Sequence, residues 1–323
     1  MRIVISGGAG FIGSHLADLC LARGHSVTVI DNLITGRLTN IVHLLGRPDF
    51  RLLERNIIDD QPDVDGDLYC HLASPASPVG YGRFPVETML TNSLGTHRLL
   101  DLARRDRAIF LLASTSEAYG DPLVHPQPET YWGNVNPTGP RACYDESKRY
   151  AEALTITYVR QYGLDARIVR IFNTYGPRND PNDGRIVPNF VTQALRGEPI
   201  TVYGDGRQTR SFCYVADLVE GIWRAATTPG IDGEVINLGN PLEYAAIELA
   251  HLVKRLAGSP SEVVHLPARE EEIARRRPDI AKAGRLLGWT PQVGIEDGLR
   301  RTIEWFRTEL DIAPATDRVV EPA

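Results

Sequence analysis

The chain has few cysteines, and none of them lies close to another. Cys20, Cys70, Cys143 and Cys213 form no CxxC pair, so the sequence indicates neither a disulfide framework nor a metal site. Buried free thiols are the better interpretation. A long apolar run and a signal peptide are also lacking, because Met1 leads straight into an expected core strand. We therefore expect a soluble, cytoplasmic protein with no membrane partner.

Positive charge is also in short supply. The chain has 35 Lys and Arg against 41 Asp and Glu, a net charge of −6, which gives no overall basic signal for binding nucleic acid. Internal repeats and low-complexity segments are not visible. With 323 residues, of which 42% are hydrophobic, the chain can bury one large core or two smaller ones.

The first 31 residues contain the strongest pattern. The apolar run 3–5 predicts a buried parallel strand, and apolar residues at helical spacing from 16 to 20 predict the helix that follows. Gly24 ends that helix, and a second apolar run ends in Asp31. The turn between the first strand and the helix is rich in glycine: Gly7, Gly8, Gly10 and Gly13.

This order of strand, glycine turn, helix, strand and acid predicts a dinucleotide site. The glycines let the backbone approach a pyrophosphate, and the helix N-terminus offers unpaired N–H groups. Asp31 can accept hydrogen bonds from the adenosine ribose, which favours NAD and repels a 2′-phosphate. The glycine spacing fits both GxGxxG and GxxGxxG, the second typical of short-chain dehydrogenase relatives, and leaves the superfamily open.

Apolar runs alternate with helical patterns as far as residue 176. The alternation requires a parallel sheet with helices on both faces. The sequence thus predicts an α/β protein, a Rossmann-type doubly wound parallel sheet with a smaller mixed α/β C-terminal substrate lobe. Strands are expected at 68–73, 109–113 and 166–172, with another bracketed by 50–53 and 57–58, and helices at 88–105 and 144–162.

After Gly176 the alternation breaks. We expect a NAD-binding domain at 1–176, with 211–239 returning to it, a substrate lobe at 177–210 and 240–312, and a loose tail at 313–323. The expected elements of this part are helices at 186–195, 215–226, 245–256 and 295–310, and strands at 200–203 and 235–238.

Tyr144 and Lys148 stand four residues apart at the start of a helix and share one of its faces. A neighbouring ammonium favours the phenolate, so we expect the pKa of Tyr144 to fall toward neutrality. Such a tyrosine can take a proton from a substrate hydroxyl as hydride leaves for NAD. A YxxxK pair alone is common on solvated helix faces. Behind a dinucleotide turn and a strand that ends in Ser-Thr-Ser-Glu, it indicates a catalytic pair.

Two residues of that strand end can join the chemistry. Thr115 can hydrogen-bond the same substrate oxygen, and Glu117 can act as acid or base on a neighbouring carbon. The alternative interpretation is a capped turn, because Ser and Thr are common turn residues. The Pro-, Gly- and Asn-rich loop 122–140 is long enough to be functional.

Six segments carry a resemblance to a known family over about Met1 to Leu310. They are HLASPASP (71–78), LLASTSEAYGDPLVHPQ (111–127), YWGNVNPTGPRACYDESKR (131–149), RIFNTYGPR (170–178), NDGRIVPNF (182–190) and VYGDGRQTRSFCYVADL (202–218). On these segments the chain resembles the extended short-chain dehydrogenases/reductases that act on nucleotide sugars. Within them it is most similar to the UDP-glucuronate decarboxylases, also called UDP-xylose synthases.

The resemblance implies roles for many residues. The catalytic set is Thr115, Glu117, Tyr144, Lys148 and Arg210. Arg210 is often assigned as a proton donor; its high pKa favours carboxylate binding or orientation of a water. NAD contacts are implied for Tyr144 and Lys148 and for Gly7, Gly10, Phe11, Ile12, Gly13, Asp31, Asn32, Thr35, Gly36, Asn56, Ile57, Leu72, Ser74, Thr91, Ala113 and Thr174. UDP-sugar contacts are implied for Glu117 and Arg210 and for Ser77, Tyr81, Asn173, Arg178, Arg185, Asn189, Val202, Tyr203 and Arg277.

The implied reaction is the NAD-dependent decarboxylation of UDP-glucuronate to UDP-xylose. Oxidation at C4 gives a β-keto acid, loss of CO₂ gives an enolate, and re-reduction at C4 regenerates NAD; early release would give the UDP-4-keto-pentose. A 4,6-dehydratase is the first alternative, although Ser116 replaces the acid such enzymes use. A 4-epimerase is the next. A catalytically dead nucleotide-sugar-binding scaffold is the non-enzyme alternative, against which the intact catalytic residues argue.

The resemblance also implies a homodimer, in which the helices at 88–105 and 144–162 form a four-helix bundle with a second copy. Two positions depart from the family. Glu87 and Leu90 replace lysines, and we expect Arg83, Arg178 or Arg185 to supply the missing cation. Asn56 replaces an adenine-reading aspartate; its carbonyl oxygen can still accept from the adenine amine, so we expect weaker retention of NAD.

Overall fold

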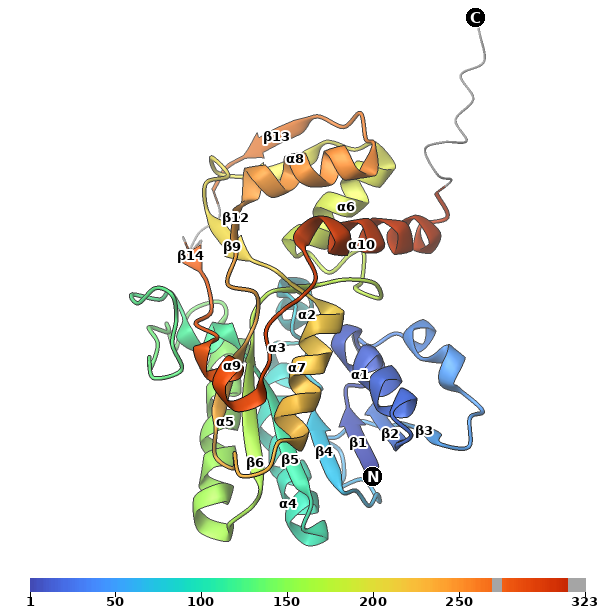
Figure 1. Cartoon of the computed structure of the whole chain (residues 1–323), viewed down its shortest axis with the longest axis vertical. Helices are drawn as coiled ribbons and strands as arrows, with labels where there is room; N and C mark the ends of the chain where they lie inside the picture. The colour runs from blue at the N-terminus through green and yellow to red at the C-terminus, as the bar shows by residue number, and fades with distance from the viewer. Residues whose placement is uncertain (269–274, 313–323) are drawn as a thin grey trace, which may run out of the picture.

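A seven-stranded parallel sheet forms the centre of the protein, whose computed structural model describes residues 1–268 and 275–312. The strand order is β11-β6-β5-β4-β1-β2-β3, so the chain winds outward from β1 in both directions (Figure 1). The point where the order reverses lies between β1 and β4, where ligands bind in open α/β sheets. The strands are β1 Arg2–Ser6, β2 Ser26–Asp31, β3 Phe50–Glu54, β4 Leu68–His71, β5 Ile109–Thr115, β6 Ala166–Ile171 and β11 Val235–Leu238.

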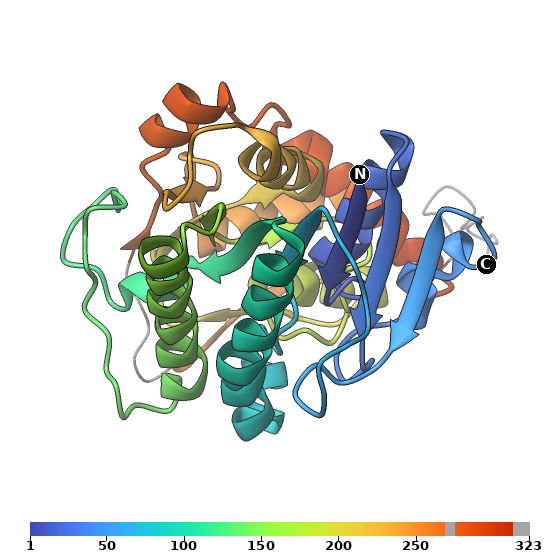
Figure 2. The ribbon, with the colours of Figure 1, turned by 90° about the horizontal axis from the view of Figure 1, so that it is seen from below.

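Helices cover both faces of this sheet. One face packs against α1 (Phe11–Ala22) and α7 (Val215–Thr227), the other against α4 (Thr96–Asp106) and α5 (Ala142–Tyr162), which lie side by side in Figure 2. Side chains alternate between the two cores, as strand geometry requires: Ile3 and Ile5 join the first core and Val4 the second. The doubly wound Rossmann-type sheet is confirmed.

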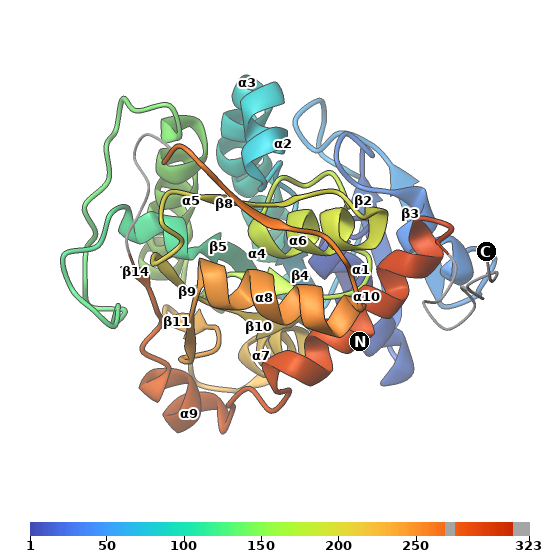
Figure 3. The same cartoon turned by 90° about the horizontal axis from the view of Figure 1, so that it is seen from above.

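Most of the rest of the chain lies over the carboxyl ends of the strands, whereas α9 packs beside the sheet against β11 and α7 (Figure 1). In Figure 3 the helices α6, α8 and α10 cross above the sheet. Three small sheets, β10-β7, β12-β9-β14 and β13-β8, accompany them. Their elements are β7 Thr174–Tyr175, α6 Ile186–Arg196, β8 Ile200–Tyr203, β9 Thr209–Ser211, β10 Cys213–Tyr214, β12 Glu243–Ala245, α8 Ala246–Ala257, β13 Val263–Leu266, β14 Arg275–Arg276, α9 Ala281–Leu287 and α10 Ile295–Glu309.

The structure differs from expectation at several element boundaries. The helix expected at 88–105 is α3 Pro85–Leu90, a π turn η3 Thr91–Gly95 and α4, preceded by a short α2 Pro78–Arg83. The third strand ends at Glu54, because the Asn56 side chain accepts the Ile58 amide (3.3 Å) and turns the backbone. Strands of two to four residues, such as β14, are too short to show periodicity. The remaining 3₁₀ turns are η1 Leu38–Asn40, η2 Val42–Leu44 and η4 Ser116–Tyr119.

The strand expected at 235–238 does return to the main sheet, where β11 pairs with β6 in parallel register. The tail expected at 313–323 lies outside the described residues. Across residues 1–268 and 275–312, no helix combines the length and hydrophobicity of a bilayer span.

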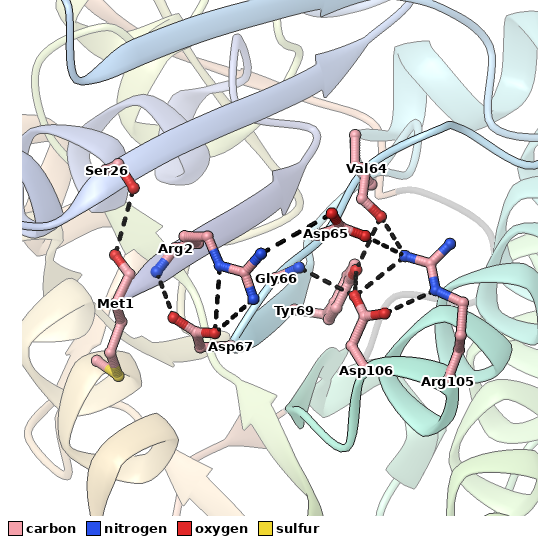
Figure 4. A network of polar contacts seen from close by, with 10 residues as sticks. All are labelled: Met1, Arg2, Ser26, Val64, Asp65, Gly66, Asp67, Tyr69, Arg105 and Asp106. Carbon is pink, nitrogen blue, oxygen red and sulfur yellow. Dashed lines mark hydrogen bonds and ion pairs between the residues drawn. The ribbon is translucent and has the colours of Figure 1, made fainter.

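A polar network ties the amino ends of β1 and β4 to the end of α4 (Figure 4). Asp106 is its centre: its carboxylate accepts from the Tyr69 hydroxyl (2.5 Å), the Gly66 amide (3.0 Å) and Arg105 Nε (2.6 Å). Burial alone would raise the pKa of Asp106, but the hydrogen bonds from Arg105, Tyr69 and Gly66 outweigh it and lower the pKa to about 2.

We expect Asp106→Ala to lower the free energy of unfolding by about 2 kcal/mol at pH 7, because the folded pKa lies below that of the unfolded chain. The contribution of Asp106 is complete above about pH 4 and is lost as the pH falls toward 2. Urea unfolding at pH 7 and pH 3 measures both effects. Asp65→Ala, a change at a 69% exposed side chain of the same network, is the control. Equal losses for the two variants would contradict the prediction.

Candidate active site

The glycine turn after β1 forms one wall of a cavity of about 680 Å³ at the carboxyl ends of the strands. Gly7 has a φ of +76°, and a Cβ added to it would lie 2.6 Å from the Ala73 nitrogen. A Cβ on Gly13 would lie 2.2 Å from the Gly7 carbonyl oxygen. Only glycine fits these positions. Because glycine has no side chain, the backbone packs closely in this turn and a ligand can approach it at the N-terminus of α1.

Asp31 closes this wall at the end of β2. One carboxylate oxygen accepts the Ala9 amide and the other the Leu33 amide, each at 2.9 Å. Burial raises the pKa of Asp31, and the two amide bonds oppose that rise. The amides fix the carboxylate at the edge of the cavity with lone pairs left for ribose hydroxyls.

All residues for which NAD contacts are expected line this cavity. Beyond the glycines of the turn and Asp31, they come from the ends of the strands β2 to β6 and from α1, η3, α5 and β7: Phe11, Ile12, Asn32, Thr35, Gly36, Asn56, Ile57, Leu72, Ser74, Thr91, Ala113, Tyr144, Lys148 and Thr174.

Tyr144 and Lys148 lie on the first turns of α5, facing the end of β5. The Tyr144 hydroxyl is hydrogen-bonded to Thr115, and its ring stacks on Tyr81 with centroids 5.3 Å apart. Lys148 Nζ donates to the Ala113 carbonyl at 2.9 Å and lies 6.0 Å from the centre of the Tyr144 ring. Tyr144 thus lies together with Lys148 and Thr115, the two side chains expected to assist it.

The prediction that Lys148 lowers the pKa of Tyr144 toward neutrality is wrong for the protein without a bound cofactor. Burial raises the pKa of Tyr144 to about 12, against the opposing hydrogen bond from Thr115. Burial also lowers the pKa of Lys148 to about 7, with Glu152 opposing, so its ammonium loses charge near neutrality. The sequence pattern gave the spacing of the pair correctly but carried no information on how deeply both groups are buried.

Glu117 lies between two arginines. Its carboxylate forms ion pairs with Arg141, which precedes α5, and with Arg276 of β14. Burial alone would raise the pKa of Glu117; the charges of Arg276, Arg141 and Arg210 outweigh it and lower the pKa. Glu117 is therefore ionised at neutral pH, and it can accept a proton or orient water but is a poor proton donor.

Neither Arg141 nor Arg276 was expected to be a site residue. Arg277 was expected there, but it is not among the residues that line the cavity, whereas Arg276 is. The arginine triplet 275–277 before Pro278 was the feature of the sequence that could have indicated Arg276. Which of the three side chains points into the cavity follows only from the pairing of β14 with β9. Arg141 follows a Pro-Gly-rich loop, and its sequence neighbours gave no such signal.

The other residues expected at the UDP-sugar end line the cavity: Ser77, Tyr81, Asn173, Arg178, Arg185, Asn189, Val202, Tyr203 and Arg210. Of the three cations proposed to replace the missing lysines, Arg185 forms an ion pair with Asp183 (2.6 Å) and Arg178 one with Asp18 (2.7 Å). Arg83 lines the cavity beside Glu87 and lies over the Phe84 ring.

Comparison with known proteins agrees with this geometry. A family model described as the NAD dependent epimerase/dehydratase family matches residues 3–239. The chain belongs to this family. The glycine turn and the fixed carboxylate of Asp31 fit NAD, the cofactor of the epimerase/dehydratase family, on the close approaches described above.

Curated relatives in the family include UDP-glucuronic acid decarboxylases. The chain is 51% identical to UDP-glucuronic acid decarboxylase 1 of Xenopus tropicalis over 310 residues, which are 96% of this chain and 73% of that protein. It is 50% identical to UDP-glucuronic acid decarboxylase 3 of Arabidopsis thaliana over 313 residues, 97% of this chain and 91% of that protein.

Solved structures of the same fold include epimerases and a dehydratase. The UDP-glucose 4-epimerase of Thermotoga maritima, with UDP-glucose, is 33% identical with a TM-score of 0.86 over 96% of this chain and 100% of that one. The dTDP-glucose 4,6-dehydratase DesIV of Streptomyces venezuelae, with NAD bound, is 31% identical with a TM-score of 0.85 over 96% and 98%. The fold alone does not select among these reactions.

Asp145 generates a testable pH dependence. Burial and the charge of Glu117 raise the pKa of Asp145 to about 7, with Arg141 opposing. Between about pH 4 and pH 7 the folded protein thus binds a proton that the unfolded chain does not, and stability falls as the pH rises. The side chain of Asp145→Asn cannot ionise. Between pH 4.5 and 8, we therefore expect the free energy of unfolding of this variant to fall by about 2 kcal/mol less than that of the unsubstituted protein. Urea unfolding across this range measures the difference, and parallel curves would contradict the prediction.

Proposed function

We propose that the chain decarboxylates UDP-glucuronate and releases UDP-xylose. The observation that carries the proposal is the cluster of Arg141, Arg210 and Arg276 around Glu117, beside Tyr144 and Thr115 in the same cavity as the dinucleotide turn. The identity of about half of all positions to UDP-glucuronic acid decarboxylases supports it.

The charges of this cluster suit a sugar that carries a carboxylate. The charges of three guanidinium groups act on the carboxylate of Glu117. Arginine binds carboxylates in a planar, two-pronged geometry. Asp145, whose pKa is raised to about 7, adds no negative charge beside Arg141 below that pH.

Tyr144 and Thr115 handle the oxygen at C4. Bound NAD supplies a hydride acceptor and, when oxidised, a positive ring whose charge favours the Tyr144 phenolate. Tyr144 takes the proton of the C4 hydroxyl, and Thr115 orients that oxygen from the end of β5. Lys148 fixes the helix start against β5 through its bond to the Ala113 carbonyl.

Loss of CO₂ follows from the ketone that this oxidation creates. The carboxylate then lies β to a carbonyl group, so the electrons of the breaking C–C bond enter an enolate. The hydroxyls of Tyr144 and Thr115 can donate hydrogen bonds to its oxygen, as in an oxyanion hole. A proton returned to C5 and reduction at C4 complete UDP-xylose.

Ser116 supports decarboxylation over 4,6-dehydration. Dehydration requires an acid that protonates the leaving hydroxyl, whereas the side chain of Ser116 is a buried hydroxyl, which is too weak an acid for that step. Decarboxylation needs no acid at that position, because CO₂ leaves without a proton.

Proton NMR of the protein with UDP-glucuronate and NAD tests the proposal. We expect a UDP-pentose with loss of CO₂, and we expect Tyr144→Phe to lower turnover by at least about 100-fold because it removes the proton acceptor. Tyr162→Phe, at the exposed far end of the same helix, is the control and should retain full turnover. Formation of UDP-galacturonate, or an unchanged substrate, would overturn the assignment.

A homodimer built from α3, α4 and α5 is also part of the proposal. Five hydrophobic side chains of α3, η3 and α5 are between 37% and 62% exposed: Val86, Met89, Leu90, Leu94 and Tyr150. Because α3 packs against α5, these side chains share one surface, and apolar patches of this kind mark interfaces. A second copy would cover it in a four-helix bundle. The cytoplasmic location stays a prediction, with which the four free cysteines agree.

Light scattering or solution scattering should give twice the chain mass of 35.7 kDa. Met89→Glu places a charge in the apolar patch, so we expect it to shift the protein toward the monomer. Val42→Glu, at a 56% exposed valine of η2 outside the patch, should leave the mass unchanged. A monomer mass for the unsubstituted protein would remove the dimer from the proposal.

A further inference from the structure

The arginine triplet at β14 sends its side chains in two directions. β14 runs parallel to β9, with Arg275 opposite Thr209 and Arg276 opposite Arg210. Successive side chains of a strand point to opposite sides. Arg276 accordingly reaches Glu117 and the Gly120 carbonyl (3.1 Å), whereas Arg275 and Arg277 turn to the other side.

Glu243 lies on that other side, next to Arg275. Its carboxylate accepts from Arg275 Nη2 (2.9 Å) and from the Thr209 hydroxyl (2.6 Å), and it lies 3.2 Å from His125 Nε2 and 3.9 Å from Arg277 Nη1. The side chain is only 14% exposed. One carboxylate thus joins β9, β12, β14 and the long loop after η4.

Gln127 holds the same strand from the loop. The Gln127 amide donates to the Arg277 carbonyl (2.9 Å), and the Arg277 amide donates back to Gln127 Oε1 (2.8 Å). The Asp279 amide donates to the Gln127 carbonyl (3.0 Å). Gln127 also lies 3.2 Å from His125 Nδ1, so His125 links it to Glu243.

Two paired residues specify the register of a strand only weakly. β14 has only two, so contacts beyond its pairing with β9 must help to fix which arginine faces the cavity. A slip of one residue would turn Arg276 away from Glu117 and toward Glu243. The contacts of Glu243 oppose such a slip, because they bind both neighbours of Arg276 on the outer side.

We infer that Glu243 is a positioning residue for the reaction: by holding Arg275 and Arg277 outside the cavity, it fixes the register that brings Arg276 to Glu117. The inference rests on the proposed function. It predicts a defect in the binding and loss of the sugar carboxylate, for which Arg276 supplies part of the environment, and not in oxidation at C4, which Tyr144 and Thr115 perform.

The test uses the full-length protein with Glu243→Ala, Glu243→Asp, Arg276→Ala and the double variant Glu243→Ala/Arg276→Ala. We expect Glu243→Ala to lower kcat/KM 10- to 100-fold, since small displacements of groups that bind and orient the substrate cost rates of this order. Reduced cofactor, read at 340 nm, should accumulate during turnover, because oxidation continues while the later steps slow. Glu243→Asp should restore part of the rate.

The double variant separates positioning from a general loss of structure. If Glu243 acts through Arg276, the double variant is no slower than Arg276→Ala alone. Glu296→Ala, which breaks the exposed ion pair with Arg255 between α8 and α10, is the matched control and should behave as the unsubstituted protein. A Glu243→Ala enzyme with unchanged kcat/KM, or a double variant with additive losses, would overturn the inference.

A readout without substrate keeps the inference separate from the proposed function. The amides of Arg277 and Asp279 are bonded to Gln127, so we expect their hydrogen exchange to speed up at least tenfold in Glu243→Ala and not in Glu296→Ala. Unchanged exchange would overturn the inference whatever the substrate. Failure of the unsubstituted protein to release CO₂ from UDP-glucuronate, with faster exchange in the variant, would instead overturn the function and leave the register role supported.

Discussion

The ion pair between Glu117 and Arg276 joins residues 159 positions apart, and the architecture of the site depends on it. Glu117 belongs to the end of the central sheet, and Arg276 to a short strand of the small sheet above it. A buried carboxylate without cations would be costly, so the arrangement of Arg141, Arg210 and Arg276 is a condition for ionised Glu117. The polar contacts of β14 with the loop 122–140 and with β12 also hold Arg276 in this arrangement.

The two halves of the proposed chemistry come from different parts of the fold. The parallel sheet supplies the glycine turn, Asp31, Thr115 and, through α5, Tyr144, because the carboxyl ends of its strands meet at one edge. The upper region supplies Arg210 and Arg276. Oxidation at C4 thus uses groups of the part shared with epimerases and dehydratases of known structure, and the arginine cluster adds the environment for a carboxylate.

Charge and burial decide what each group can do. Tyr144 and Lys148 are adjacent in space, yet burial moves the pKa of each toward its neutral form. Glu117 lines the same cavity but stays ionised, since three arginines surround it. The residue types and their spacing, which the sequence gives, do not determine these protonation states. The states follow from burial and from neighbouring charges.

The sequence by itself determined the parallel sheet, the dinucleotide turn and the pairing of Tyr144 with Lys148, because periodicity and short-range spacing act within a few residues. The tertiary structure alone decided that Arg276 and not Arg277 faces the cavity, and that Arg141 shares Glu117. It also decided the pKa of Tyr144. Each of these depends on register between strands distant in the chain or on burial, and neither quantity is encoded in the local pattern of residues.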